Sequence, residues 1–229
     1  MTCFPLGDAA LVIEFAEKSS SEVRQRIRAY CEVLRASSVL GFLDVIPAYT
    51  TATVLYDPLQ LDYPAAKAHA LRLLEHSHTL SASSARLHEI PVCYAEQCAP
   101  DLQSVAAALK LTPQAVVDVH CSVEYEVAVV GFVPAFPYLV ELPEQLRLPR
   151  RATPRLAVPA GSVGIAGAQT GIYPFETPGG WHLIGRTPLR LFRPTHQPPS
   201  LLQPGDRVKF YPISEQEFFR QSQYLTNEP

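Results

Sequence analysis

The chain has 229 residues, 47% of them hydrophobic, and a formal net charge of −3 at pH 7. This length suits one large or two small domains with a substantial core. The weak negative charge gives no reason to expect nucleic acid or an anionic membrane as a partner. No apolar run reaches the roughly 20 residues that span a bilayer, and the first residues lack the features of a secretory leader. We therefore expect a cytoplasmic protein.

The cysteines and prolines indicate which kinds of structure to expect. Five cysteines without a CxxC spacing favour reduced thiols over a disulfide framework or a zinc site, so no metal site is expected. There are 22 prolines and 11 glycines. Proline at about twice its ordinary usage predicts fixed turns and edge segments rather than long helices.

Residues 1–83 predict a small α/β domain. Three serines at 19–21 offer caps to a helix with one apolar stripe, and an alanine- and leucine-rich stretch predicts a second helix. The expected elements are a strand at 7–15, a helix from 21, strands at 41–50 and 50–57, and a helix at 62–76. This order, completed by a further strand, is the βαββαβ order of a ferredoxin-like split βαβ sandwich. The small polar segment 81–85 is interpreted as a linker.

Residues 84–229 predict a second, mainly β domain, so the overall class is α+β. A strand at 87–94 precedes two short helices, the second opened by Thr112 and Pro113. After a strand at 124–132, short strands and frequent turns continue to a last strand within 203–213. A terminal helix follows, with Ser214 and Glu217 as a capping box. Many short strands with Gly/Pro turns favour a β-barrel or a sandwich.

The stretch GSVGIAGAQTGIYPFETPGGWHLIGRTP, residues 161–188, is interpreted as the functional surface. Its glycines permit positive φ and close approach, and polar or aromatic side chains stand between them: Gln169, Thr170, Tyr173, Glu176, Trp181, His182 and Arg186. GSVGIAG lacks the lysine and the following helix of a P-loop, so turn glycines are the better interpretation. The PGG turn is predicted to join two strands as a hairpin.

Each candidate residue also has a structural interpretation. The arginines of PRRATPR, residues 149–155, suit bidentate anion binding or a solvated basic loop. The aromatic–proline run GFVPAFPYL either closes a core or lines an apolar groove. His182 suits proton transfer but equally a structural donor role, Trp181 suits packing, and Glu176 with Arg186 suits a cross-strand ion pair. His120 is predicted to be a surface residue at a helix C-terminus. The residues alone define no reaction.

Several long motifs carry a family resemblance: GFVPAFPYL, PRRATPR, VPAGSVGIAGAQTGIYPFETPGGW and LIGRTPLRLF. With these motifs the chain resembles the 5-oxoprolinase B-subunit family, also called allophanate hydrolase subunit 1, which includes the KipI-type inhibitor of a histidine kinase. The resemblance implies a small α/β domain followed by a cyclophilin-like β-barrel. The chain departs from the family at Ala135, where glycine is usual, and at Val140 and Glu141, which replace two glycines.

The resemblance implies ATP-dependent opening of 5-oxoproline (pyroglutamate) to L-glutamate. The implied cofactor is ATP with Mg²⁺, at a site on a partner subunit or shared with one. The implied partners are the 5-oxoprolinase A subunit and a larger cyclophilin-like companion of the same type as the 5-oxoprolinase C subunit or allophanate hydrolase subunit 2. Two alternatives share the motifs: a KipI-type kinase regulator and a component of urea-carboxylase or allophanate-type amide processing.

We predict one cleft that gathers the functional residues. The catalytic residues suggested by the resemblance are His182, Arg151 and Arg155. The groove-binding residues are Phe132, Phe136, Tyr138, Gln169, Thr170, Tyr173, Glu176, Trp181 and Arg186.

Overall fold

The computed structural model of the chain describes residues 2–76 and 85–226. The chain divides into two compact units, Met1–Ser84 and Ala85–Pro229, where the sequence suggested domains 1–83 and 84–229. Most of the predicted linker, residues 81–84, lies outside the described residues.

The N-terminal unit is a four-stranded antiparallel sheet with two helices. Its elements are β1 (Thr2–Pro5), β2 (Ala10–Glu14), α1 (Ser21–Ala36), β3 (Phe42–Pro47), β4 (Thr51–Tyr56) and α2 (Tyr63–His76). The strand order is β1-β2-β4-β3. The predicted cap is confirmed, because the Ser20 side chain accepts a hydrogen bond from the Val23 amide at 3.2 Å.

The sheet has a strand that the sequence did not predict. It precedes the first predicted strand, so the described elements run ββαββα. The last strand of the predicted βαββαβ order would follow α2 and lies outside the described residues. Gly7 takes φ +63° and the Leu6 amide donates to the Ala10 carbonyl, which turns β1 back onto β2.

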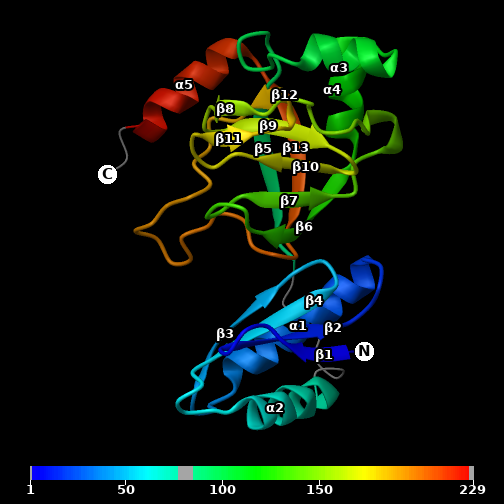
Figure 1. Ribbon diagram of the computed structural model, residues 1–229. Helices are drawn as coiled ribbons and strands as arrows, with labels where there is room; N and C mark the ends of the chain where they lie inside the picture. The colour runs from blue at the N-terminus through cyan, green and yellow to red at the C-terminus, as the bar shows by residue number, and fades with distance from the viewer. Residues whose placement is uncertain (1, 77–84, 227–229) are drawn as a thin grey trace. The chain divides into compact units, whose positions relative to one another are not determined.

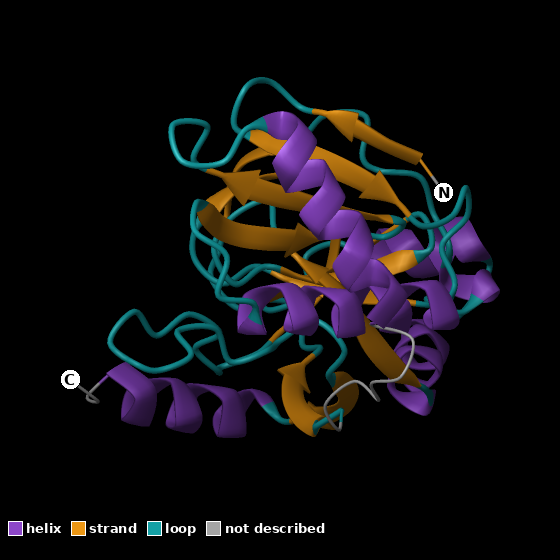
Figure 2. Cartoon of the chain, turned by 90° about the horizontal axis from the view of Figure 1, so that it is seen from below, coloured by secondary structure: helices purple, strands orange, loops and turns teal. Residues whose placement is uncertain are grey.

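Both helices pack on the same face of this sheet. Leu11, Val45 and Val54 point to that face and share one buried cluster with Tyr30 of α1 and Ala70 of α2. The Tyr30 hydroxyl donates to the Ala70 carbonyl at 3.0 Å, so the two helices are also joined by a buried hydrogen bond. Seen from below, the helices cross in front of these strands (Figure 2).

The C-terminal unit is built on a closed seven-stranded barrel, which confirms the predicted β-barrel (Figure 1). Its elements are β5 (Leu87–Cys93), α3 (Leu102–Leu109), α4 (Pro113–Ser122), β6 (Glu124–Val130), β7 (Pro137–Val140), a 3₁₀ turn η2 (Glu144–Leu146), β8 (Arg155–Val158), β9 (Ser162–Ala166), β10 (Gln169–Ile172), β11 (Thr177–Gly179), β12 (His182–Arg186), β13 (Arg207–Ile213) and α5 (Glu215–Thr226). Around the barrel the order is β10-β7-β6-β13-β5-β12-β9, and β9 pairs with β10 to close it.

Strands from the two ends of the unit lie side by side in the barrel. β5 and β13 pair in parallel along their whole length, from Leu87 opposite Arg207 to Cys93 opposite Ile213. The strands β8 and β11 form a separate two-stranded sheet. Figure 1 shows α3 and α4 on one side of the barrel and α5 on the other.

The prediction for His120 is wrong. The residue is fully buried in the barrel core, stacked on Phe210 with ring centroids 4.6 Å apart. Thr170 donates to the Gly164 carbonyl, so His120 Nε2–H donates to the Thr170 hydroxyl at 3.0 Å and Nδ1 accepts from the Tyr94 hydroxyl at 2.9 Å. Burial lowers the pKa of His120 to about 3. This side chain is therefore a neutral, fully bonded part of the core.

No helix in the described part of the chain is long and apolar enough to cross a membrane. All five cysteines are free thiols. The described residues contain no group of three or more His, Cys, Asp or Glu side chains placed to hold a metal ion.

Candidate functional site

A pocket of about 290 Å³ lies in the C-terminal unit, and we call it the aromatic pocket. The walls come from the loop before β7, from the segment before β8, and from β11 with the residues that follow it. The lining residues are Phe132, Phe136, Tyr138, Arg150, Pro154, Tyr173, Thr177, Pro178, Gly179, Gly180 and Trp181. Its volume is at the lower end of the range for small-molecule sites, so it suits a small metabolite.

Phe136 is the centre of the aromatic wall. Its ring lies 4.9 Å from Tyr138, 5.1 Å from Tyr173 and 5.6 Å from Trp181, centroid to centroid, in edge-to-face arrangements. Phe132 makes the same kind of contact at 5.6 Å, but 61% of its surface stays exposed. Edge-to-face contacts fix the rings relative to one another. The pocket is therefore preformed, with one solvent-exposed aromatic ring at its rim.

The backbone of the aromatic–proline loop explains how Phe132 reaches the rim. Phe132 and Ala135 take φ values of +70° and +64°, and the Gly131 amide donates to the Phe136 carbonyl to close the turn. Left-handed backbone of this kind is unfavourable for residues with a Cβ. This backbone would suit glycine, the residue that the family resemblance leads us to expect at position 135. Neither Ala135 nor the Val140–Glu141 pair lines the aromatic pocket.

Glycines allow the opposite wall to approach the rings. A Cβ added to Gly179 would collide with the Tyr173 ring and hydroxyl, and one added to Gly171 would lie 3.0 Å from the Phe136 ring. These two positions require glycine for close approach. The glycine-rich stretch therefore contributes to the pocket through its shape.

Arg150 is the single charged residue among the described residues that line this pocket. Burial raises the pKa of Tyr138 and of Tyr173, and the positive charge of Arg150 opposes the shift in both. Both phenols are therefore neutral at pH 7. The result is an apolar, aromatic cavity with one exposed guanidinium at its edge, which suits a small ligand with an anionic group and an apolar or amide body.

The other two arginines of the segment 149–155 are already paired. Arg155 donates to both oxygens of Asp101 at 2.6 and 2.9 Å, and Arg151 donates to Asp101 Oδ1 at 3.0 Å. The Leu183 amide adds a third donor, at 2.7 Å to Oδ2. Asp101 is only 3% exposed. We call Asp101, Arg151 and Arg155 the Asp101 cluster.

The charge of Asp101 is maintained by these partners. Burial opposes ionisation, but the hydrogen bonds from Arg155 and the Leu183 amide, with the charges of both arginines, hold the pKa of Asp101 below its ordinary value. The cluster joins the start of α3 to the arginine segment and to β12. Because the Arg151 amide also donates to the Gly180 carbonyl, the cluster fixes the segment that carries Arg150 and Pro154.

His182 belongs to the same support. Its Nε2 lies 2.9 Å from the Pro149 carbonyl, which can only accept, so Nε2 carries the hydrogen. His182 is not among the residues that line the aromatic pocket. This position matches the structural donor role that the sequence analysis considered for His182. The catalytic roles predicted for His182, Arg151 and Arg155 remain predictions.

The predicted groove residues do not share one hollow. Phe132, Phe136, Tyr138, Tyr173 and Trp181 meet in the aromatic pocket, whereas Arg186 lines a different pocket. Thr170 is buried against His120. Gln169 pairs with Ala166 at the start of β10, and Glu176 is exposed; neither lines the aromatic pocket.

The reason is a wrong prediction for the PGG turn. Instead of forming a hairpin with β12, β11 pairs with β8, while β12 pairs with β9 and β5. Trp181 and Arg186 are therefore at opposite ends of one strand segment rather than across a hairpin. The expected ion pair with Glu176 is also wrong, because Arg186 donates to the Ala160 carbonyl and lies over the Phe218 ring.

Sequence reasoning missed Asp101 as a partner and gave Arg150 no separate role. Asp101 is 50 and 54 residues away from the arginines that it binds. Its position at the start of a predicted helix is ordinary for aspartate. The better signal was the proline spacing, since Pro149 and Pro154 hold the segment extended and place neighbouring arginines on different faces.

The comparisons with known proteins agree with this architecture. Residues 1–202 match the family model described as "Carboxyltransferase domain, subdomain C and D". The barrel and its preceding α/β unit thus define a protein of the carboxyltransferase-domain class. The chain is 41% identical to a protein of Bacillus subtilis (strain 168) that is named as the B subunit of 5-oxoprolinase, over 93% of each chain. It is 46% identical to the protein of the same name from Escherichia coli O157:H7, over 93% of this chain and 96% of the relative.

The chain belongs to the 5-oxoprolinase B-subunit family. The solved structure of TTHA0988 is also similar, with a TM-score of 0.79 and 41% identity over 90% of this chain. This chain spans about 40% of the length of that protein.

Proposed function

We propose that the chain is one component of an ATP-dependent 5-oxoprolinase complex, in which it binds 5-oxoproline for conversion to L-glutamate. The observation that carries the proposal is the identity of 40–46% to three proteins named as B subunits of 5-oxoprolinase, over 92–93% of this chain. A match of this extent includes most of both units.

The aromatic pocket has the chemistry that this substrate needs. 5-Oxoproline is a small five-membered lactam with one carboxylate. Its ring would lie against Phe136 and Trp181, and its carboxylate would be held by Arg150 at the pocket edge. The Asp101 cluster would act indirectly, by holding the segment on which Arg150 stands.

The pocket does not contain all the groups that the reaction requires. Its described lining has no carboxylate and no histidine, which are the commonest general acids and bases. Opening a lactam at the expense of ATP requires that the carbonyl oxygen accept the terminal phosphoryl group of ATP, which makes the carbon electrophilic. Water then adds to this carbon, and the C–N bond breaks as the protonated ring nitrogen leaves as the amine. The acyl phosphate that remains is hydrolysed to glutamate and phosphate. We infer that the companion proteins, namely the 5-oxoprolinase A subunit and the larger cyclophilin-like subunit, supply the nucleotide site with its Mg²⁺ and the missing acid–base groups.

A second function has one specific observation in its favour. The description of the matching family model names a carboxyltransferase domain. The alternative function is therefore a role in processing a urea-like amide during carboxyl transfer. Urea carries no carboxylate, and this alternative leaves Arg150 at the pocket edge without a ligand group. The 5-oxoproline proposal uses both the apolar walls and the cation.

Reconstitution tests the proposal. The chain is mixed with its companion subunits, and glutamate release from 5-oxoproline is measured with ATP and Mg²⁺. We expect turnover that disappears when this chain is omitted and returns when it is added back. Glutamate release that proceeds equally without this chain, or turnover of urea in place of 5-oxoproline, would contradict the proposal.

A further inference from the structure

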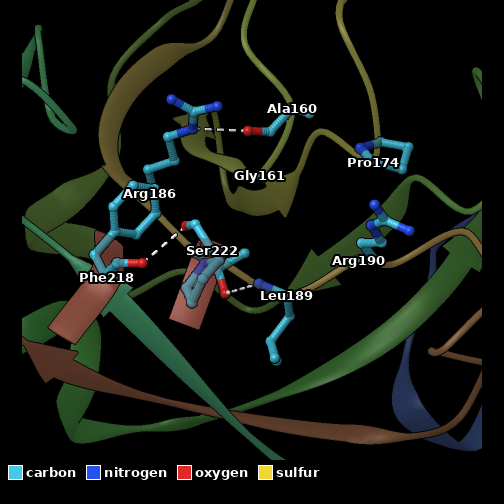
Figure 3. Close-up of a pocket in the computed structure, with 10 residues that line it drawn as sticks. Ala160, Gly161, Pro174, Arg186, Leu189, Arg190, Phe218 and Ser222 are labelled. Carbon is cyan, nitrogen blue, oxygen red and sulfur yellow. Dashed lines mark hydrogen bonds between the residues drawn. The ribbon is translucent and has the colours of Figure 1, made fainter. Parts of the chain in front are cut away.

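A second pocket, of about 170 Å³, lies in the C-terminal unit beside α5 (Figure 3). We call it the Phe218 pocket. Its walls are the turn before β9, the segment that follows β12, and one face of α5. The lining residues are Ala160, Gly161, Pro174, Arg186, Thr187, Pro188, Leu189, Arg190, Phe218 and Ser222. None of them lines the aromatic pocket.

Arg186 is held in place without an acidic partner. Its Nε donates to the Ala160 carbonyl at 2.8 Å, and its guanidinium carbon lies 5.6 Å from the centroid of the Phe218 ring. A carbonyl and an aromatic face orient a guanidinium but do not neutralise it. In the described part of the chain, no group accepts a hydrogen bond from the two terminal nitrogens of Arg186, which leaves them available to a ligand.

The turn at Gly161 makes this arrangement possible. Gly161 has φ +80°, and an added Cβ would collide with the Thr187 carbonyl and lie 3.6 Å from Arg186 Cγ. The amides here are already used, since Gly161 donates to the Tyr173 carbonyl and Thr187 donates to the Gly161 carbonyl. A ligand would therefore be bound mainly by the arginine side chains.

The lining is positively charged. Arg186 and Arg190 flank the pocket in Figure 3, and none of the ten lining residues is acidic. Arg190 is exposed and forms no ion pair with any described carboxylate. The Asp101 cluster shows the contrasting case, in which two arginines share one buried carboxylate. Two unneutralised guanidinium groups favour a dianion with several acceptor oxygens.

We propose that the Phe218 pocket binds a phosphate group. Its volume corresponds to a few water molecules at about 30 Å³ each, so it fits a single phosphate and not an entire nucleotide. The ligand would be free inorganic phosphate or the terminal phosphate of a nucleotide whose base lies outside the pocket. The site is independent of where 5-oxoproline binds.

Calorimetric titration of the full chain with inorganic phosphate, at constant ionic strength, tests the site. We expect saturable binding, weakened about tenfold in Arg190→Ala, the loss expected for one charge-assisted contact worth about 1.4 kcal/mol. Arg193→Ala is the matched control, because Arg193 is close to Arg190 in sequence and does not line the pocket. The fluorescence of Trp181 should not change, because Trp181 lines the other pocket.

The same titration with ATP separates the two sources. If a nucleotide phosphate is the ligand, ATP competes with phosphate and Arg190→Ala weakens both; if free phosphate is the ligand, ATP does not compete. Either result supports the pocket. No saturable phosphate binding by the wild-type chain, or equal weakening in Arg190→Ala and Arg193→Ala, would overturn the proposal.

Discussion

The aromatic pocket and the Asp101 cluster use neighbouring arginines in opposite ways. Arg151 and Arg155 both donate to the buried Asp101 carboxylate, which also accepts from the Leu183 amide, so both guanidinium groups are held within the protein. Arg150 is next to them in sequence but lines a cavity with neutral aromatic walls. The difference shows that an arginine becomes available to a ligand when the fold leaves it without an acid. Proximity in sequence does not decide this.

Removing Asp101 should give the largest effect. Asp101→Ala leaves two arginines without their buried partner, and we expect a loss of about 3–5 kcal/mol in the free energy of unfolding. Urea denaturation measures it, with the exposed Asp118→Ala as the control that should change little. Equal stability of the two variants would show that the cluster does not support the pocket.

The pH dependence of stability offers a second test of Asp101. Because its pKa is lowered in the folded protein, the cluster contributes stability above the unfolded value of about 3.9, and this is lost as pH falls further through the folded pKa. The difference in unfolding free energy between the wild type and Asp101→Asn should therefore shrink in acid. A constant difference down to the lowest pH that the fold tolerates would argue against an ionised Asp101.

His120 is a second polar group satisfied inside the fold, and its effect should be intermediate. Its pKa is about 3 when folded and about 6.5 when unfolded, so the unfolded chain binds the proton first and stability falls as pH drops from about 6.5 towards 3. Between pH 7 and 5 the expected loss from this residue is about 2 kcal/mol, at 1.36 kcal/mol per unit. Urea denaturation of wild type and His120→Gln at both pH values measures it; identical pH dependence would contradict the buried neutral state.

Arg150 should affect substrate binding and not stability. In the reconstituted complex, Arg150→Gln is expected to raise the KM for 5-oxoproline about tenfold with little change in kcat, since it removes one charge-assisted contact to the carboxylate. The exposed Arg207→Gln, on β13, is the matched control and should leave KM unchanged. An unchanged KM in Arg150→Gln would show that Arg150 does not bind the carboxylate of 5-oxoproline.

Ala135 should give the smallest effect. At φ +64° an alanine is strained, and Ala135→Gly relieves about 1 kcal/mol of strain while it increases the freedom of the unfolded chain. We expect stability to rise by less than about 1 kcal/mol, as measured by thermal unfolding. A clear loss of stability would show that packing of the buried Ala135 methyl group stabilises the protein by more than the strained backbone at this residue destabilises it.

Local features of the fold could be predicted from the sequence. Ser20, Thr112 and Ser214 each cap a helix as their patterns indicate, because capping depends on residues within one turn. The choice between barrel and sandwich depends on strand pairings far apart in the chain, above all β5 with β13. The position of β1 was missed because its four residues, TCFP, carry no alternating pattern.

In the candidate site, too, features that depend on residues close in sequence could be predicted, and features that depend on distant pairings could not. The aromatic residues could be singled out from GFVPAFPYL and the single tryptophan. That Tyr173 and Trp181 meet Phe136 depends on the pairing of distant strands. Asp101 was missed because its partners are distant in sequence. His120 could have been found, since Val116, Val117 and His120 lie at helical spacing and are all buried. Arg186 was misplaced because the pairing of β11 with β8 cannot be predicted from the PGG turn.

The central claim is that the aromatic pocket, with Arg150 at its edge, binds 5-oxoproline. Titration of the chain with 5-oxoproline, followed by the fluorescence of its single tryptophan, tests this most directly because Trp181 lines the pocket. We predict a saturable change that is about tenfold weaker in Arg150→Gln and intact in Arg207→Gln. A flat titration of the wild type, or identical titrations of the wild type and Arg150→Gln, would contradict the account.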